Sequence, residues 1–269
     1  MTERDWVPDG IDLTRPSVAR VYDYLLGGFH NFPADRQLAE SVIAAYPLTP
    51  ATARAARSFL TRAVLHLARD HGVRQFLDLG SGIPTQGNVH DVVQEVDPGS
   101  RVVYVDVDPV AVAHGEAILR DNPNAVAVQA DLRRPDEVLS LPAVTELLEP
   151  GRPTAVLMML VLHFVPDEDG PADILRGYRE GLGTGSWLAL SHGTTEFTPR
   201  EVTDEVTKLY RTTTMPGTPR NREQIGTLLE GYELVPPGLV LLEQWQPGSV
   251  ADVQDPERFP VWAGVARAS

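Results

Sequence analysis

The sequence predicts an α/β protein with a mostly parallel, seven-stranded, doubly wound sheet, a C-terminal antiparallel hairpin and an N-terminal helical cap. Three observations support this prediction. Apolar residues recur at helical spacing over about the first 70 residues, short apolar runs then alternate with helix-like runs from Arg74 onward, and two further apolar runs follow a pair of helices. Strands that alternate with helices form parallel sheets covered on both faces, which explains strand-like runs that are apolar throughout.

The N-terminal segment, residues 1–72, is expected to form the helical cap. In the stretch RPSVARVYDYLLGG, apolar residues lie at i, i+3, i+4, i+7 and i+8, a proline suits the first turn, and two glycines end the helix. The stretches PADRQLAESVIAAY and TPATARAARSFLTRAVLHLARDHG predict a second and a third helix. Gly72 follows the third helix and marks its end.

Residues 73–269 are expected to form one compact unit around the sheet. Its strand-like runs are rich in β-branched and aliphatic residues and lie at 75–79, 101–106, 125–130, 154–162 and 186–191. Helix-like runs lie at 87–96, 109–120, 135–148 and 171–182, and two more lie around 198–213 and 220–230. The runs LVPPGLVLLEQW and PVWAGVARA then predict the antiparallel pair.

The composition excludes several classes of partner and site. The 269 residues carry a formal net charge of −14, which disfavours attraction to nucleic acid or to anionic lipid. There is no cysteine and no HExxH or similar ligand spacing, so we expect neither a disulfide nor a metal site. No stretch approaches the ~20 apolar residues of a membrane span, and the start MTERDWVPDG lacks a signal-peptide pattern. We therefore expect a soluble, cytoplasmic protein.

The stretch FLDLGSG holds a glycine turn at the carboxyl end of the first strand, where open α/β sheets bind ligands. Gly80 and Gly82 let the backbone approach a ligand without a Cβ in the way, and Ser81 lies between them. A helix that begins near residues 85–87 would offer unpaired N–H groups beside the turn. Asp78 precedes the turn and is a candidate for contact with a ligand's ammonium group, with a structural role as the alternative.

Two further acids follow the next two strands. Asp106 ends the second strand and could accept two hydrogen bonds from a ribose diol. Asp131 ends the third and could accept from an adenine amino group, with Val107 and Leu132 on the two sides of the ring. For both acids, capping the helix that follows is the simpler alternative. Together with Asp78 they surround one turn with carboxylates, which disfavours a diphosphate and favours an adenosine that carries a sulfonium and an ammonium.

These motifs resemble those of class I S-adenosylmethionine-dependent methyltransferases. FLDLGSG resembles their first motif, VVYVDVDP the ribose-binding acidic loop, VQADLRRP the adenine-binding loop, and VLMMLVLHFVPD the fourth strand with its tail. More narrowly, PSVARVYDYLLGGFHNFPADRQLAE resembles the N-terminal signature of a bacterial S-adenosyl methyltransferase family that was formerly a domain of unknown function. The resemblance runs from Arg15 to the final strand. It implies a Rossmann-like class I methyltransferase fold and S-adenosyl-L-methionine as the cofactor.

The resemblance also implies which residues bind the cofactor. It assigns the methionine end to Gly80, Ser81 and Gly82, the ribose to Asp106, the adenine to Asp131 and Leu132, and the surroundings of the sulfonium to Met159 and Leu160. It further implicates Tyr22, Tyr24, Gly28 and Asn31 as a lid over the cofactor. Core packing of Tyr22 and local loop stabilisation by Asn31 are the alternatives. Pro84 stands where many such enzymes have a third glycine, and it should stiffen the turn.

The implied activity is transfer of a methyl group to a small-molecule acceptor. His163 follows the fourth strand and His192 the fifth, so each is a candidate general base, with a structural role as the alternative. The sequence leaves open the acceptor, its reacting atom and the oligomeric state. A noncatalytic sensor that binds S-adenosylmethionine is one alternative function. An NAD-dependent oxidoreductase is another, although its fingerprint requires a third glycine or alanine where this chain has Thr85.

Overall fold

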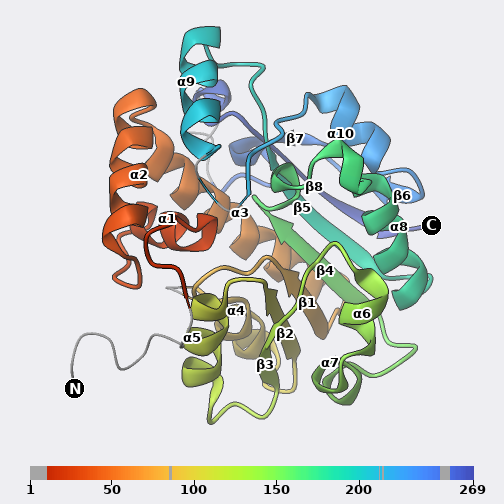
Figure 1. The fold of residues 1–269 in the computed structure, drawn as a ribbon. Helices are drawn as coiled ribbons and strands as arrows, with labels where there is room; N and C mark the ends of the chain where they lie inside the picture. Colours follow the sequence, from red (N-terminus) through yellow and green to blue (C-terminus); the bar gives the residue numbers. More distant parts are fainter. Residues whose placement is uncertain (1–10, 85–86, 212, 214, 249–254) are drawn as a thin grey trace.

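The computed structural model describes residues 11–84, 87–211, 213, 215–248 and 255–269 (Figure 1). Three helices come first: α1 (Val18–Leu25), α2 (Pro33–Ala45) and α3 (Thr49–Asp70). The alternating region follows, with β1 (Gln75–Leu79), α4 (Val89–Val96), β2 (Arg101–Asp106), α5 (Pro109–Leu119), β3 (Ala125–Gln129), α6 (Pro135–Ser140), α7 (Pro142–Leu147), β4 (Thr154–Met159), α8 (Pro171–Leu182) and β5 (Trp187–Gly193). The remaining elements include α9 (Arg200–Tyr210), α10 (Arg222–Leu228), β6 (Tyr232–Leu234), β7 (Val240–Leu241) and β8 (Val261–Ala268).

The strands form one mixed sheet, which confirms the predicted fold class. Seven of the eight described strands follow one path in the order β3-β2-β1-β4-β5-β8-β6, and β7 pairs with β8 beside that path. The strands β1 to β5 pair in parallel. By contrast, β8 is antiparallel to β5, β6 and β7. The strand order changes direction between β1 and β4, and in such sheets this switch point is where ligands bind.

Two elements differ from the prediction: one strand is shorter than its hydrophobic run, and one helix is divided in two. The run 154–162 was expected to be one strand, but β4 stops at Met159 because Leu160 adopts a φ of 50° and leads into a 3-10 turn, η1 (Leu162–Phe164). The run 135–148 is divided into α6 and α7, since Pro142 has no N–H to continue the first helix. The position expected for the start of the fourth helix, near residue 85, lies outside the described residues, and α4 begins at Val89.

Alternate residues of each strand face opposite layers of helices. Phe76 and Leu157 belong to a hydrophobic cluster shared with α3, α4 and α5. Leu77 and Met158 belong to a second cluster, shared with α6, α7, α8 and α10. Figure 1 shows the sheet between these two layers. The alternation determines that Asp78, two residues after Phe76, lies on the α3 side of the sheet.

The first two helices contribute most of a small core that also includes Ala53 of α3. Val21 and Leu25 of α1 pack with Leu38 and Val42 of α2, and partly buried residues of α9 join the same cluster. In Figure 1, α2 and α9 lie side by side at one end of the molecule, although many elements separate them in sequence. By contrast, α3 is buried mainly against the sheet. The three N-terminal helices therefore do not form a single separate layer.

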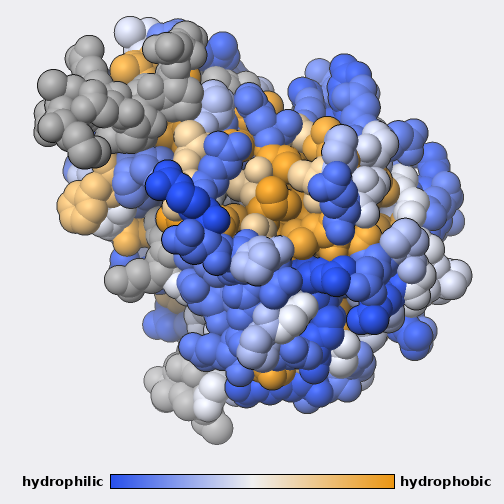
Figure 2. Space-filling view, turned by 90° about the horizontal axis from the view of Figure 1, so that it is seen from below, coloured by the Kyte–Doolittle hydropathy of each residue, from blue (hydrophilic) through white to orange (hydrophobic). Residues whose placement is uncertain are grey.

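Hydrophilic residues cover most of the face shown in Figure 2, and hydrophobic residues gather near its middle. None of the helices in the described ranges combines the length and the apolar character that a bilayer crossing requires.

Candidate active site

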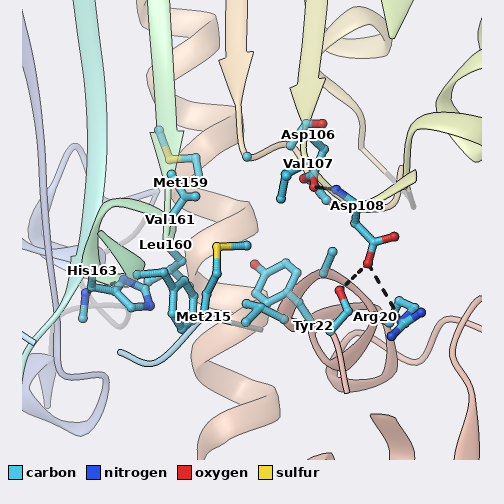
Figure 3. A pocket seen from close by; sticks show the side chains of 18 of the residues that line it. Arg20, Tyr22, Asp106, Val107, Asp108, Met159, Leu160, Val161, His163 and Met215 are labelled. Atoms are coloured by element: carbon cyan, nitrogen blue, oxygen red, sulfur yellow. Dashed lines mark hydrogen bonds and ion pairs between the residues drawn. The ribbon is translucent and has the colours of Figure 1, made fainter. Parts of the chain in front are cut away.

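A cavity of about 870 Å³ opens at the carboxyl ends of β1, β2 and β4. Residues before α1 and in α1, α2 and α3 line it on one side. The other lining residues come from the strand ends and the loops after them, from η1, α9 and residues 215–216, and from the start of β8. Figure 3 shows the strand ends with Asp106 and Met159 on one side of this space and Tyr22 of α1 on the opposite side. The cavity thus lies at the switch point of the sheet, and the N-terminal helices cover it.

The glycine turn has the conformation that its sequence predicts. Gly80 and Gly82 both have a φ of 66°, a region that side chains disfavour. The Gly80 N–H donates to the Val105 carbonyl at 2.8 Å, which folds the turn back onto the end of β2. A Cβ on Gly80 would overlap the Val161 side chain, whereas a Cβ on Gly82 would meet no atom within 4 Å. The backbone at Gly82 and Ser81 therefore borders open cavity space.

Asp106 connects the end of β2 to this turn. Its Oδ2 accepts from the Gly82 N–H at 2.7 Å, and its Oδ1 accepts from the Asp108 N–H at 2.8 Å. Burial raises the pKa of Asp106 to about 6, although these backbone hydrogen bonds lower it. Each carboxylate oxygen retains a second lone pair, so Asp106 can still accept from the hydroxyl groups of a ligand.

Asp78 is a buried carboxyl group that receives no hydrogen bond from the described residues. Its residue is 4% exposed, it lines the cavity, and none of the described residues donates a hydrogen bond to it. Burial raises the pKa of Asp78 to about 7, while the positive charge of Arg57 lowers it and the negative charge of Asp106 raises it further. A cationic ligand group would provide the partner that this carboxylate lacks.

Asp131 has a different environment. Its carboxylate accepts from Arg133 Nε at 2.9 and 3.0 Å, and Arg133 also donates to Asp169 at 2.8 Å. Burial alone would raise the pKa of Asp131, but the hydrogen bonds and charge of Arg133 outweigh it, so the pKa is lowered. Asp131, Leu132 and Val107 line the cavity together. The negative charge at this end is thus partly neutralised by Arg133, which the sequence pattern did not indicate.

The end of β4 forms another side of the cavity. Met159 and Leu160 both line it, and the Leu160 N–H donates to the carbonyl and the hydroxyl oxygen of Ser191, each at 3.0 Å. A φ of 50° is unfavourable for leucine, and such strain persists where surrounding contacts fix it, often at functional sites. These hydrogen bonds hold Leu160 at the cavity edge.

The two candidate bases occupy different positions. His163 lines the cavity, whereas His192 is completely buried and is not among the lining residues. His192 Nε2 accepts from Arg220 at 3.2 Å, and its Nδ1 donates to the Gly193 carbonyl at 2.8 Å. Burial lowers the pKa of both histidines, to about 4 for His192 and well below the usual value for His163. The structure therefore brings only His163 to the site, as a neutral ring.

Only one of the four predicted lid residues reaches this cavity. The Tyr22 hydroxyl donates to the Ala53 carbonyl at 3.1 Å, and the ring lines the cavity. Tyr24, Gly28 and Asn31 instead line a second, separate cavity. Asn31 Nδ2 donates to Asp23 Oδ2 at 2.8 Å, which holds the loop after α1 against that helix. The structure thus does not bring Tyr24, Gly28 and Asn31 to the glycine turn.

Four buried polar residues connect the N-terminal helices to the cavity, and we call them the cap latch: Ser17, Arg20, Asp35 and Asp108. The Ser17 N–H donates to Asp35 Oδ1 at 2.9 Å, and its hydroxyl donates to Asp108 Oδ2. Arg20 Nε lies 3.1 Å from Asp35 Oδ2 and 3.9 Å from Asp108 Oδ2. Figure 3 shows the contacts of Asp108. The latch joins α1 and α2 to the loop that follows β2.

Sequence reasoning missed the latch and Arg57. Arg57 of α3 lines the cavity, and its Nη2 donates to the Gly87 carbonyl at 2.8 Å. The sequence does indicate one role of Asp108, because an acid before a proline is typical of a helix N-cap. Its side chain accepts from the Val110 N–H at 2.8 Å, as such a cap does. Single arginines and serines on helices carry no such signal.

The residues present fit an adenosine with cationic groups. The cavity offers the buried carboxyl group of Asp78, which no described residue contacts as a donor, a second carboxylate at the end of β2, and backbone at Gly82 that a ligand can approach. Within the described ranges, no group of three histidines, cysteines or acids is placed to hold a metal ion.

Comparisons with known proteins agree with this geometry. A family model described as S-adenosyl methyltransferase matches residues 4–269. The structure of a DUF574 family protein from Streptomyces avermitilis MA-4680 is 38% identical, with a TM-score of 0.90 over 96% of this chain and 99% of that one. A proposed methyltransferase from Thermobifida fusca YX is 36% identical, with a TM-score of 0.91 over 98% of this chain and 99% of that one.

A more distant solved structure shares the fold. The plantazolicin methyltransferase BamL, in complex with a triazolic desmethylPZN analog and SAH, is 11% identical, with a TM-score of 0.54 over 93% of this chain and 95% of that one. No curated protein matches the chain.

Proposed function

The chain belongs to the S-adenosyl methyltransferase family, and we propose that it transfers a methyl group to a small-molecule acceptor in the cavity beneath α1. It is an S-adenosyl-L-methionine-dependent methyltransferase, as the resemblance of its motifs indicated. One observation supports a small-molecule acceptor in this cavity: a single cavity extends from the buried carboxylates to the side chains beyond β4. The cofactor and the acceptor could therefore share one covered space.

The cofactor roles follow from the positions of the lining residues. We assign the cofactor's ammonium to Asp78 and its carboxylate to Arg57, since both residues line the cavity beside the glycine turn. Gly80, Ser81 and Gly82 would border the methionine end, and Asp106 would accept from the ribose. Asp131, Leu132 and Val107 would contact the adenine, and Met159 and Leu160 would lie beside the sulfonium.

When bound, S-adenosyl-L-methionine supplies an electrophilic methyl group on a positively charged sulfur. The residues of this chain would mainly orient the two reactants and keep water away from them. Tyr22 covers the cavity from α1. His163, which is neutral and lines the cavity, would contact the acceptor, and His192 would support the loop between β4 and α8 through Arg220.

We also propose that residues 1–72 act as the cap and residues 73–269 as the catalytic unit. The separate core of α1 and α2 supports a cap with its own packing. The position of α3 in the sheet core indicates that this helix anchors the cap to the catalytic unit.

Calorimetry and methyl transfer would test the function. We expect SAH and S-adenosyl-L-methionine to bind, and NAD to bind much more weakly, because the buried acids would repel a diphosphate. Incubation with methyl-labelled cofactor and a small-molecule fraction of a bacterial extract should give a labelled small product. Label found only in macromolecules would contradict the small-molecule acceptor, and tight NAD binding would contradict the site assignment.

A further inference from the structure

We propose that the acceptor is an uncharged, planar aromatic molecule, bound in the part of the cavity that η1, α9, residues 215–216 and the start of β8 enclose. This inference rests on the proposed function, because it assumes that the cofactor occupies the end with the acids. The lining residues of this part, which we call the acceptor chamber, are His163, Phe164, Val206, Tyr210, Met215, Pro216 and Val261.

Aromatic rings and thioethers form the walls of the acceptor chamber. The rings of His163 and Phe164 have centroids 4.2 Å apart, and those of Phe164 and Tyr210 are 5.8 Å apart. Figure 3 shows the Met215 side chain between His163 and Tyr22, with Met159 near the same space. Aromatic rings favour further rings in offset or edge contacts, and methionine sulfur adapts to ring edges. These walls fit a flat aromatic molecule.

None of the seven side chains that line the acceptor chamber is charged. Burial lowers the pKa of His163 well below its usual value and raises the pKa of Tyr210 to about 12, so both are neutral. Two arginines lie nearby. Arg15 lines the cavity and donates to the Thr213 carbonyl at 2.9 Å, and Arg220 contacts His192 and is paired with Asp167 at 2.6 Å. An ionic acceptor would lose its hydration against these seven side chains without gaining an opposite charge from them.

Two polar groups could orient an uncharged acceptor. The Tyr210 hydroxyl has no hydrogen-bond partner among the described residues, although its ring lines the cavity. The Gly193 N–H lies 3.4 Å from His163 Nδ1, a long contact that favours the tautomer with its proton on Nε2. An aromatic molecule with one hydroxyl or carbonyl group could bind both the walls and one of these groups.

The probes are 2-naphthol and 2-naphthoate, which share one ring system and differ in charge near neutral pH. Calorimetry with the SAH-loaded full chain should give an affinity for 2-naphthol at least about tenfold higher than for 2-naphthoate. Tyr210→Phe should weaken 2-naphthol binding about 3- to 10-fold, the scale of one hydrogen bond. Equal affinities, or tighter binding of 2-naphthoate, would overturn the inference.

A pair of substitutions on α9 separates the acceptor chamber from the cofactor site. Val206→Asp places a charge in the chamber, whereas Val202→Asp places one on the same helix at a residue that does not line the cavity. We expect Val206→Asp to lower 2-naphthol affinity at least about tenfold and Val202→Asp to leave it unchanged, with SAH affinity unaffected in both. Normal SAH binding with no response to Val206→Asp would refute the acceptor chamber alone. Failure of the unmodified protein to bind SAH would refute the proposed function itself.

Discussion

The Ser17 hydroxyl donates a hydrogen bond to the Asp108 carboxylate across 91 positions of sequence, and both residues are buried. Ser17 precedes α1, and Asp108 follows β2, so this contact joins the start of α1 to the loop after β2. The Asp108 N–H in turn donates to Asp106 at 2.8 Å. The position of the cap is therefore coupled to that of the acid expected to bind ribose.

Removing this contact should destabilise the protein. Ser17→Ala deletes a hydrogen bond to a charged, buried group, so we expect the free energy of unfolding to fall by about 1.5–3 kcal/mol in chemical denaturation. The matched control is Ser41→Ala on α2, whose hydroxyl bonds only to the Gln37 carbonyl of its own helix. The control should change the free energy by less than about 0.5 kcal/mol. Equal effects of the two substitutions would show that the Ser17–Asp108 hydrogen bond does not contribute to stability.

Asp106→Asn should weaken cofactor binding while the protein remains folded. The amide keeps one acceptor oxygen for the backbone but loses the charge, so calorimetry should show SAH affinity reduced by about 1.5–3 kcal/mol, or roughly 10- to 150-fold. Asp136→Asn, in the first turn of α6 and outside the cavity, is the control and should bind SAH normally. An unchanged dissociation constant for Asp106→Asn would mean that this loop does not contact the cofactor.

Cofactor affinity should rise with pH because of Asp78. Burial raises the pKa of Asp78 in the folded protein to about 7, above its value in the unfolded chain. Its contribution to the folding stability of the ligand-free protein is therefore fully present below the unfolded-chain pKa and is lost as pH rises through about 7. A bound ammonium favours the ionised form. We therefore expect SAH affinity to increase about tenfold between about pH 6 and about pH 8.

Asp78→Asn provides the control for this pH dependence. The amide cannot ionise, so affinity should be weaker at pH 8 and nearly flat above pH 6. Below about pH 6 a slope should remain, because the pKa of Asp106 is raised to about 6. An unaltered tenfold rise in Asp78→Asn would assign the titration to another group.

Arg57→Met tests the assignment of the cofactor's carboxylate. Methionine keeps much of the apolar side chain but removes the charge, and we expect SAH affinity to fall by about 1.5–3 kcal/mol. Arg54→Met on the same helix is the matched control, since Arg54 lines only the second cavity. Adenosine, which lacks the carboxylate, should bind both variants equally well. Loss of adenosine binding in Arg57→Met would instead indicate a misfolded cavity.

The sequence predicted the sheet and its glycine turn closely because both depend on local patterns. The strand runs 75–79 and 101–106 match β1 and β2 residue for residue, because most of their residues are apolar, as is typical of strands that helices cover on both faces. The positive φ of Gly80 and Gly82 likewise follows from the residue type.

Other features depend on contacts between distant segments, and no local pattern reveals them. The hydrophobic run after Thr154 continues past Met159, but Leu160 turns away because Ser191 holds its N–H. The aromatic and glycine residues after α1 suggested a lid, whereas Asp23 fixes Asn31 to the helix itself. Arg57 and Ser17 have partners that only the folded chain brings near.

The ribosome synthesises β8 last among the strands, although β8 lies inside the sheet. A ribosome completes β5, β6 and β7 before it adds residues 261–268, yet β8 pairs with all three. Until then the edge of β5 offers unpaired backbone groups, the kind of edge that promotes aggregation. Pro260 and Val261, which line the cavity, arrive with that strand. A polypeptide released before this point would lack both the closing strand and part of the cavity wall, so truncated translation products should be insoluble rather than partly active.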